Sequence, residues 1–230
     1  LLKNDVKVYK LMKNISLKKI LVIFLLSKPA FCNDGIWTGV FDINGHGVYD
    51  FTGLINDNKT TAYTEKAKVV YDGTIETNTN NEFIWNLSMY LKDGSFFGTA
   101  EIKGKIIDGK IMSGKWSTEP AKDFGNIYLK KNNISNKSAI NHNKKWVSIN
   151  SKIKHSFVIN NNKILGKDGN GCNYYGDLKK LNNNIYSLNI EIASCGISDG
   201  NYVGMTHIDE ENNLIINATN KNFSLFLKFK

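Results

Sequence analysis

The sequence contains no arginine and no glutamine, and it has only two prolines, three cysteines and four histidines. All 30 basic residues are therefore lysines, and asparagine occurs 32 times. A chain without guanidinium groups lacks the planar donors that make bidentate contacts to phosphate and guanine, so no nucleic-acid partner is expected. The codon usage of an AT-rich genome explains the lysine and asparagine bias.

Long apolar runs are also missing. The longest, residues 20–26, has seven residues, whereas a membrane-spanning helix needs roughly 20. We therefore expect no transmembrane anchor. Lys13, Lys18 and Lys19 precede the run, and a basic segment followed by a short apolar one is the layout of a secretory signal peptide.

The signal peptide is expected to end at Cys32. Small residues at Ala30 and Cys32 fit the two recognised positions of a signal-peptidase site. Met12 is the natural start codon, which leaves residues 1–11 as upstream translation or an alternative start with no structural role. In the alternative interpretation Cys32 is a lipidated first residue, although Phe31 stands where a lipobox has a small residue. Simple cleavage is preferred.

Cleavage changes the charge of the protein. Residues 1–32 carry seven lysines and one aspartate, so about +3 of the formal +9 remains on residues 33–230. The predicted location is exported: the periplasm, the outer-membrane surface or the medium.

Two cysteines remain, and an even count in an exported protein indicates a disulfide. Cys172 and Cys195 flank a predicted hairpin, with strands at 172–180 and 185–194, so both thiols fall near its open end. Such a bridge stabilises by roughly 3 kcal/mol. Two free buried thiols are the alternative.

The remaining sequence predicts an all-β protein. Phe83, Trp85 and Leu87 alternate with more polar residues, which is typical of a half-buried strand. Turn signals such as Asn44-Gly45 separate several further runs of the same kind. These runs lie at 35–43, 47–55, 68–77, 95–105, 110–118 and 124–130. We predict two tandem antiparallel β modules, each a small barrel or sandwich.

A polar segment without period, residues 131–143, is the predicted linker between module 1 (33–130) and module 2 (144–230). In three strands of each module, similar residues occupy the positions that should face inward. This favours an internal duplication over two unrelated sheets that share an alternating pattern by chance. All the matched aromatic side chains should therefore point inward, and 160–229 should contain no helix. The matches include Tyr71 with Tyr174, Gly73 with Gly176, Phe83 with Tyr186, Phe96 with Tyr202 and Gly98 with Gly204.

Several short motifs carry a family resemblance. They are Gly35-Ile-Trp-Thr-Gly39, Thr52-Gly-Leu-Ile55, Tyr71-Asp-Gly73 and Gly114-Lys-Trp116, followed by the cysteine hairpin. Over most of residues 35–229 the chain resembles uncharacterised exported β-rich proteins and lipoproteins of Gram-negative bacteria. The resemblance implies location and fold class, and no activity. The opening is also similar to that of lipocalins, but a duplicated chain departs from their single barrel.

No catalytic, cofactor or metal motif appears. The histidines, His46, His142, His155 and His207, lack metal-ligand spacing, and a Gly-x-Ser-x-Gly nucleophile motif is absent. His207 with Asp209 is the most enzyme-like pair, but a solvated strand edge explains it better. Paired catalytic carboxylates on distant strands stay an alternative.

The preferred function is a non-catalytic extracytoplasmic binding or interaction protein for a small ligand, a glycan or a partner protein. The competing hypothesis is a secreted hydrolase with carboxylates on facing strands. A cavity with clustered ionisable groups would favour the enzyme, and a filled apolar core would favour surfaces and loops.

Two features are candidates for a binding surface. Trp37, Trp116 and Trp146 lie near strand ends and could form an aromatic rim, although each is expected more often in a core. The turn around 195–200, which contains Gly196 and Asp199, should protrude from module 2.

Overall fold

A computed structural model of the chain describes residues 33–230, except 92, 133–139, 141–142, 150 and 183. The predicted signal peptide, with its cleavage site at Ala30 and Cys32, lies outside the described residues. The described part consists of sixteen strands and one short 3₁₀ turn, which confirms the all-β prediction. Within it, no helix has the length and hydropathy needed to cross a membrane.

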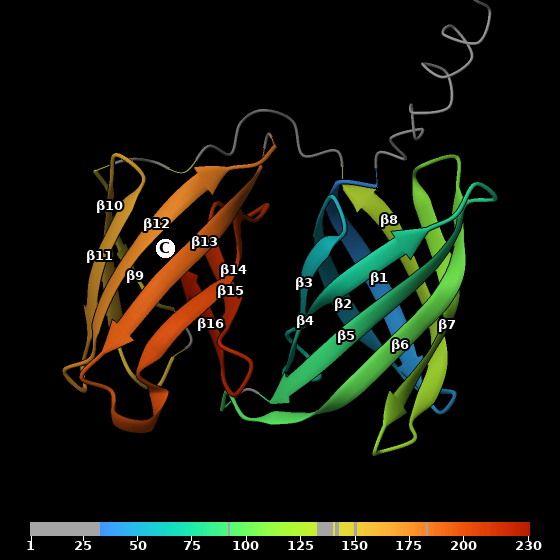
Figure 1. Cartoon of the computed structure of the whole chain (residues 1–230), viewed down its shortest axis with the longest axis horizontal. Coiled ribbons are helices and arrows are strands. Elements are labelled where there is room, and N and C mark those ends of the chain that lie inside the picture. Colours follow the sequence, from blue (N-terminus) through green and yellow to red (C-terminus); the bar gives the residue numbers. More distant parts are fainter. Residues whose placement is uncertain (1–32, 92, 133–139, 141–142, 150, 183) are drawn as a thin grey trace, which may run out of the picture. The chain divides into compact units, whose positions relative to one another are not determined.

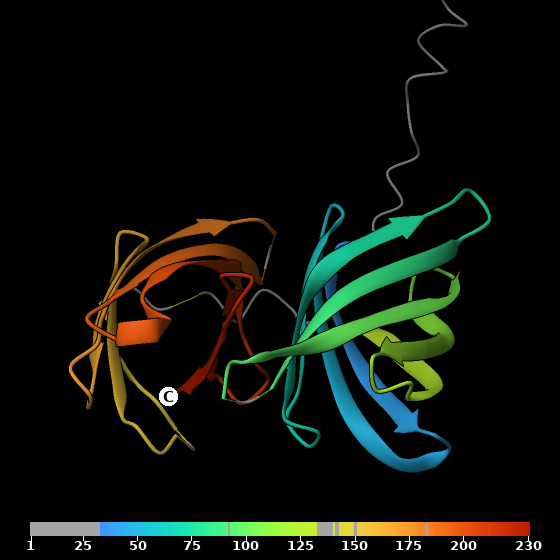
Figure 2. The ribbon, with the colours of Figure 1, turned by 60° about the horizontal axis from the view of Figure 1, so that its bottom comes forward.

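The first eight strands form a closed antiparallel barrel in which each strand pairs with the next and β8 pairs back with β1 (Figure 1). In Figure 2, β5 and β6 (green) are long and strongly twisted. The sequence pattern did not predict β3. The strands are β1 (Gly35–Ile43), β2 (His46–Asn56), β3 (Lys59–Thr64), β4 (Val69–Thr77), β5 (Glu82–Leu91), β6 (Phe96–Ile107), β7 (Ile111–Glu119) and β8 (Phe124–Asn132).

The last eight strands form a second sheet with the same neighbour order. Its ends meet, because Val147 and Lys230 exchange two backbone hydrogen bonds of 3.1 and 3.0 Å. We call it the second barrel. Its strands are β9 (Lys145–Val147), β10 (His155–Asn160), β11 (Lys163–Asp168), β12 (Asn173–Lys180), β13 (Ile185–Ala193), β14 (Gly200–Ile208), β15 (Leu214–Thr219) and β16 (Ser224–Phe229).

One expectation fails between β13 and β14, where Gly196–Ser198 form a single 3₁₀ turn. The prediction of no helix in 160–229 is wrong at this turn, which lies in a connection and leaves the strand order unchanged. The segment predicted as a linker is also partly ordered into the barrels. β8 extends to Asn132, and Ile140 is buried in the core of the second barrel.

The two barrels share their pairing register along β4–β5 and β12–β13. Tyr71 lies opposite Met89, and Tyr174 lies opposite Ile192. The same shift in residue number therefore relates β4 to β12 and β5 to β13. Gly73 and Gly176 occupy equivalent positions for the same steric reason. A Cβ atom on Gly73 would lie 1.9 Å from the carbonyl oxygen of Asn86, and one on Gly176 would lie 2.7 Å from that of Asn189.

The predicted match of the third strand is wrong by four residues. Gly98 lies opposite Met89 while Gly200 lies opposite Ile192, so Gly200 and not Gly204 is the counterpart of Gly98. The counterpart of the buried Tyr202 is then Ala100.

Phe96 was expected to point inward, but it is 49% exposed. The pairing register shifts between Met89 and Tyr90, which lie opposite Gly98 and Phe96 respectively. The extra residue of this β-bulge turns Phe96 to the outer face.

Candidate functional site: a polar groove on the first barrel

The interior of the first barrel is filled by side chains. Inward residues from all eight strands form one apolar cluster that includes Trp37, Trp85 and Trp116. The space left among them is about 20 Å³, which is room for about one water molecule. The interior therefore offers no volume for a ligand.

A much larger hollow lies on the first barrel across β4, β5, β6 and β7. This groove has a volume of about 640 Å³. Its lining includes two rows of directly opposed residues on these four strands. One row is Asp72, Ser88, Thr99 and Glu119, and the other is Thr74, Asn86, Glu101 and Ser117.

The hollow arises from short side chains on twisted strands. Five of the eight residues in the two rows are Ser, Thr or Asn with few side-chain atoms, and they leave the space above the sheet open. At Gly73 the strands approach so closely that the Asn86 carbonyl leaves no room for a side chain. The floor is therefore backbone together with the inward residues Leu87, Ala100 and Thr118.

The groove carries negative charge. Its lining includes the carboxylates of Asp72, Glu101 and Glu119, and none of its described lining residues is a lysine. Burial raises the pKa of Asp72, while a hydrogen bond with the Thr219 hydroxyl and the charge of Lys59 oppose the increase. Glu101 forms a 2.6 Å ion pair with Lys103, the next outward residue along β6.

The second barrel has different residues at the equivalent positions. The shared register places Tyr175 at the position of Asp72 and Val203 at that of Glu101. The barrels also differ in total charge. Residues 33–132 hold 13 acidic residues and 11 lysines, a net of −2, whereas 144–230 hold 7 and 11, a net of +4. The acidic groove is thus specific to the first barrel.

The two barrels contact each other through an apolar cluster and a polar network. Residues from both barrels are buried together, among them Leu54 and Tyr63 from the first and Met205 and Ile215 from the second. The Asn217 side-chain amide donates a 2.9 Å hydrogen bond to the Ala62 carbonyl. These contacts cover β3 of the first barrel.

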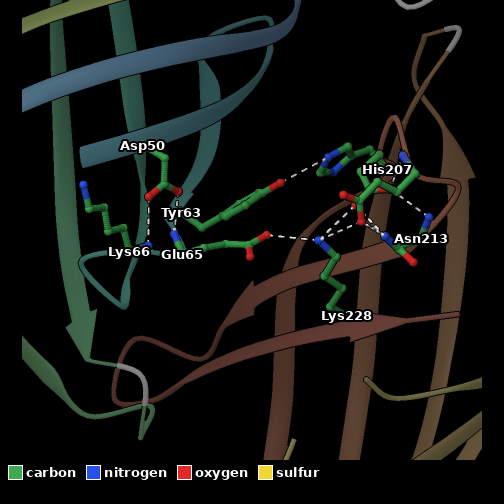
Figure 3. A network of polar contacts seen from close by, with 9 residues as sticks. Asp50, Tyr63, Glu65, Lys66, His207, Asn213 and Lys228 are labelled. Atoms are coloured by element: carbon green, nitrogen blue, oxygen red, sulfur yellow. Dashed lines mark hydrogen bonds and ion pairs between the residues drawn. The ribbon is translucent and has the colours of Figure 1, made fainter. Parts of the chain in front are cut away.

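His207 belongs to this contact. Its ring is buried, and its Nε2 atom lies 3.5 Å from the Tyr63 hydroxyl (Figure 3). Burial lowers the pKa of His207 to about 4, partly opposed by Asp209. The expectation that His207 lies at a solvated strand edge is wrong, because the first barrel covers that outward position.

Lys228 connects acidic residues of both barrels. Its ammonium lies 3.2 Å from Glu65 of the first barrel and 3.2 Å from Asp209 of the second (Figure 3). Asp209 also accepts a 3.0 Å hydrogen bond from the Asn213 side chain. This network has structural partners throughout, so we assign it to the contact between the barrels.

The three tryptophans of the predicted rim are core residues. Trp37 and Trp116 are buried in the first barrel and Trp146 in the second. The Trp37 indole donates a 2.7 Å hydrogen bond to the Asn33 carbonyl, and the Trp116 indole donates a 2.9 Å bond to that of Asp42. These hydrogen bonds hold Trp37 and Trp116 near strand ends, and none of the three tryptophans contributes to an exposed aromatic surface.

The predicted disulfide between Cys172 and Cys195 is present, as expected for an oxidising compartment. It tethers the turn that contains Gly196 and Asp199. The Asp199 carboxylate accepts a hydrogen bond from the Cys195 backbone at 2.5 Å. Between them Ile197 is 83% exposed, so this turn remains an exposed surface element.

A cluster of ionisable groups lies beside the disulfide. The Asp168 carboxylate lies 3.7 Å from His155 and accepts a 3.0 Å hydrogen bond from the Tyr174 hydroxyl. It also accepts backbone hydrogen bonds from Asn170 and Cys172. One oxygen of Asp168 therefore stabilises the turn, and the other contacts Tyr174 and His155. The cysteine sulfurs nearby are joined to each other and are not free thiolates for a metal.

No pattern in the sequence predicts the groove. Polar residues on the outward parity of a strand predict a solvated face, and the same residues line the hollow. Comparison with protein-family models, with curated proteins and with solved structures finds no match for this chain.

Proposed function

We propose that this chain is an exported, non-catalytic binding protein that holds a positively charged ligand in the groove of its first barrel. One observation carries the proposal. Only about 20 Å³ is free inside the first barrel, whereas the groove on its strands has a volume of about 640 Å³ and a lining of mostly polar residues. The space for a ligand on the first barrel is therefore on its outer surface. The disulfide supports an extracytoplasmic location.

The lining selects the chemistry of the ligand. Carboxylate and hydroxyl oxygens accept hydrogen bonds, and the carboxylates of Asp72, Glu101 and Glu119 attract cations. The described lining contains no aromatic side chain on which a sugar ring could stack. The favoured ligands are therefore molecules with ammonium or guanidinium groups, such as a basic peptide segment.

The hydrolase hypothesis has one observation in its favour. Burial raises the pKa of Asp72, and the groove also holds the carboxylate of Glu101; a carboxyl group with a raised pKa is what the acid in acid–base hydrolysis needs. The carboxylate of Glu101 is already engaged in an ion pair with Lys103. We therefore rank hydrolysis second.

Calorimetric titration of the exported protein with hexalysine and hexa-arginine tests the proposal, with hexaglutamate and a neutral oligosaccharide as comparison ligands. We expect saturable binding of the cationic peptides only, weakened as salt rises. Asn86→Trp should abolish it by filling the groove. The matched control is Asn189→Trp, at the equivalent exposed position of the second barrel.

Charge is tested separately. Glu101→Gln should weaken peptide binding about tenfold, while Glu191→Gln in the second barrel should leave it unchanged. Binding that survives Asn86→Trp contradicts the groove as the site. Turnover of the oligosaccharide that is lost on Asp72→Asn would favour the hydrolase instead.

A further inference from the structure

The wall of the second barrel carries a row of exposed apolar side chains. Val158 on β10 lies opposite Leu165 on β11, which lies opposite Tyr175 on β12. They are 42%, 58% and 50% exposed. Their neighbours along the chain, Phe157 and Tyr174 among them, already fill the interior. This row is thus a second apolar face on strands whose core side is complete.

The equivalent face of the first barrel is covered. The shared register places Leu54 at the position of Val158 and Thr61 at that of Leu165. Leu54 and Thr61 are both buried, and Leu54 belongs to the apolar cluster between the barrels. At the positions of Leu54 and Thr61, which are buried in the first barrel, the second barrel therefore has the exposed apolar residues Val158 and Leu165.

Lysines surround the apolar row. Lys145 lies opposite Val158 on β9, and Lys163 and Lys167 are two residues to either side of Leu165. All three are exposed. Residues 144–180 contain eight lysines and two aspartates, a net of +6, whereas 181–230 have three lysines and five acidic residues. The eight lysines are Lys144, Lys145, Lys152, Lys154, Lys163, Lys167, Lys179 and Lys180.

We propose that this basic wall, formed by Val158, Leu165 and Tyr175 with Lys145, Lys163 and Lys167, binds the surface of a membrane that contains anionic lipids. The surface potential of such a membrane attracts lysines that lie close to it. Aliphatic and tyrosine side chains bury in the zone between headgroups and acyl chains. A membrane supplies the negative charge and the apolar layer together.

Two other anionic partners fit less well. A nucleic acid would leave the apolar row exposed to water, and the chain has no arginine for bidentate phosphate contacts. An acidic protein needs an apolar surface shaped to a convex barrel wall, whereas a fluid bilayer adapts to it. Two acidic residues border the wall, Asp177 paired with Lys163 and Glu191 opposite Tyr175, but residues 144–180 keep a net charge of +6.

Cosedimentation of the exported protein with vesicles tests the proposal. Vesicles of phosphatidylcholine with about 30 mol% phosphatidylglycerol should bind the protein about tenfold more strongly than phosphatidylcholine alone, and salt of about 500 mM should remove the difference. Leu165→Asp and Lys167→Glu should each weaken binding severalfold. Val203→Asp is the matched control, because Val203 is 59% exposed on the same barrel, outside the wall.

A second measurement distinguishes insertion from loose adsorption. A bromine-labelled lipid should quench the added fluorescence of Tyr175→Trp and not that of Val203→Trp. Both positions are exposed, so both variants should fold, which circular dichroism can check. Equal binding to neutral vesicles overturns the proposal, as does unchanged binding of Leu165→Asp. The absence of vesicle binding, which is the result expected for a protein-docking face, overturns it as well.

Discussion

The ring of Tyr63 on β3 stacks on the ring of His207 on β14, with ring centroids 6.1 Å apart and planes 28° apart. Phe226 lies on the same tyrosine, with a centroid distance of 4.9 Å. The stack therefore joins a titratable residue of one barrel to the wall of the other. The charged groups that face His207 are Asp209, which favours its protonation, and Lys228, which opposes it.

This arrangement predicts that acid weakens the protein. The pKa of His207 is about 4 in the folded state because the ring is buried, and about 6.5 in the unfolded chain. Between these values the unfolded state binds more protons. The free energy of unfolding should therefore fall as the pH drops through this window, by about 3 kcal/mol from this residue.

Urea denaturation at neutral pH and near pH 4.5 measures the effect. His207→Phe keeps a ring against Tyr63 and removes the titrating group. Between the two pH values, the free energy of unfolding of this variant should therefore fall by about 2–3 kcal/mol less than that of the wild type. His155, whose pKa burial also lowers, is unchanged in both proteins. Equal losses would contradict the prediction.

The disulfide predicts non-additive substitutions. Cys172→Ser or Cys195→Ser should each lower the free energy of unfolding by roughly 2–4 kcal/mol, because either one removes the same crosslink. The double variant should cost little more than a single one. Denaturant titration gives these values. Thiols that can be alkylated in the untreated exported protein would argue against the bridge.

Lys228 should matter more than an exposed lysine. Its side chain is 16% exposed and contacts Glu65 and Asp209, so Lys228→Met should lower the free energy of unfolding by about 1–3 kcal/mol. Lys103→Met is the control, because Lys103 pairs with Glu101 at a position 60% exposed. That substitution should cost less than about 1 kcal/mol. Equal costs would show that the contact between the barrels gains nothing from Lys228.

The sequence predicted the strands best where one face is buried. In β5 the alternation of Trp85 and Leu87 with Asn86 and Ser88 is read directly as burial. β3 and β15 are buried on both faces because the barrels meet there, so Thr61 and Ile215 carry no alternation. The unbroken apolar run at 214–216 is the signal that could have indicated a covered outer face.

The third strand and the groove needed the structure for different reasons. The bulge before Gly98 inserts a residue, and a rule of strict alternation cannot detect such an insertion. Phe96 was therefore placed on the inward face, although it faces outward. The four-residue error in the match has another cause, because Gly204 was paired with Gly98 in place of Gly200. In the groove, Ser88 and Thr99 follow the ordinary outward pattern. The hollow depends on four strands that bring their short side chains together, and the sequence of one strand does not show this.

The duplicated glycines give the last prediction. A Cβ on Gly73 would lie 1.9 Å from the Asn86 carbonyl oxygen, whereas one on Gly176 would lie 2.7 Å from that of Asn189. The strands must separate in both cases, because backbone atoms cannot rotate away. The separation is larger at Gly73, where β4 and β5 also form the floor of the groove.

Gly73→Ala should therefore lower the free energy of unfolding by about 2–3 kcal/mol, and Gly176→Ala by about 1 kcal/mol. Both glycines lie in strand interiors, so the gain in strand propensity from alanine is the same and cancels in the comparison. Gly73→Ala should also weaken cationic peptide binding, because it moves Asp72 and Thr74 relative to Asn86. Equal destabilisation by the two substitutions, measured by denaturant titration, would contradict the register assigned to one of the barrels.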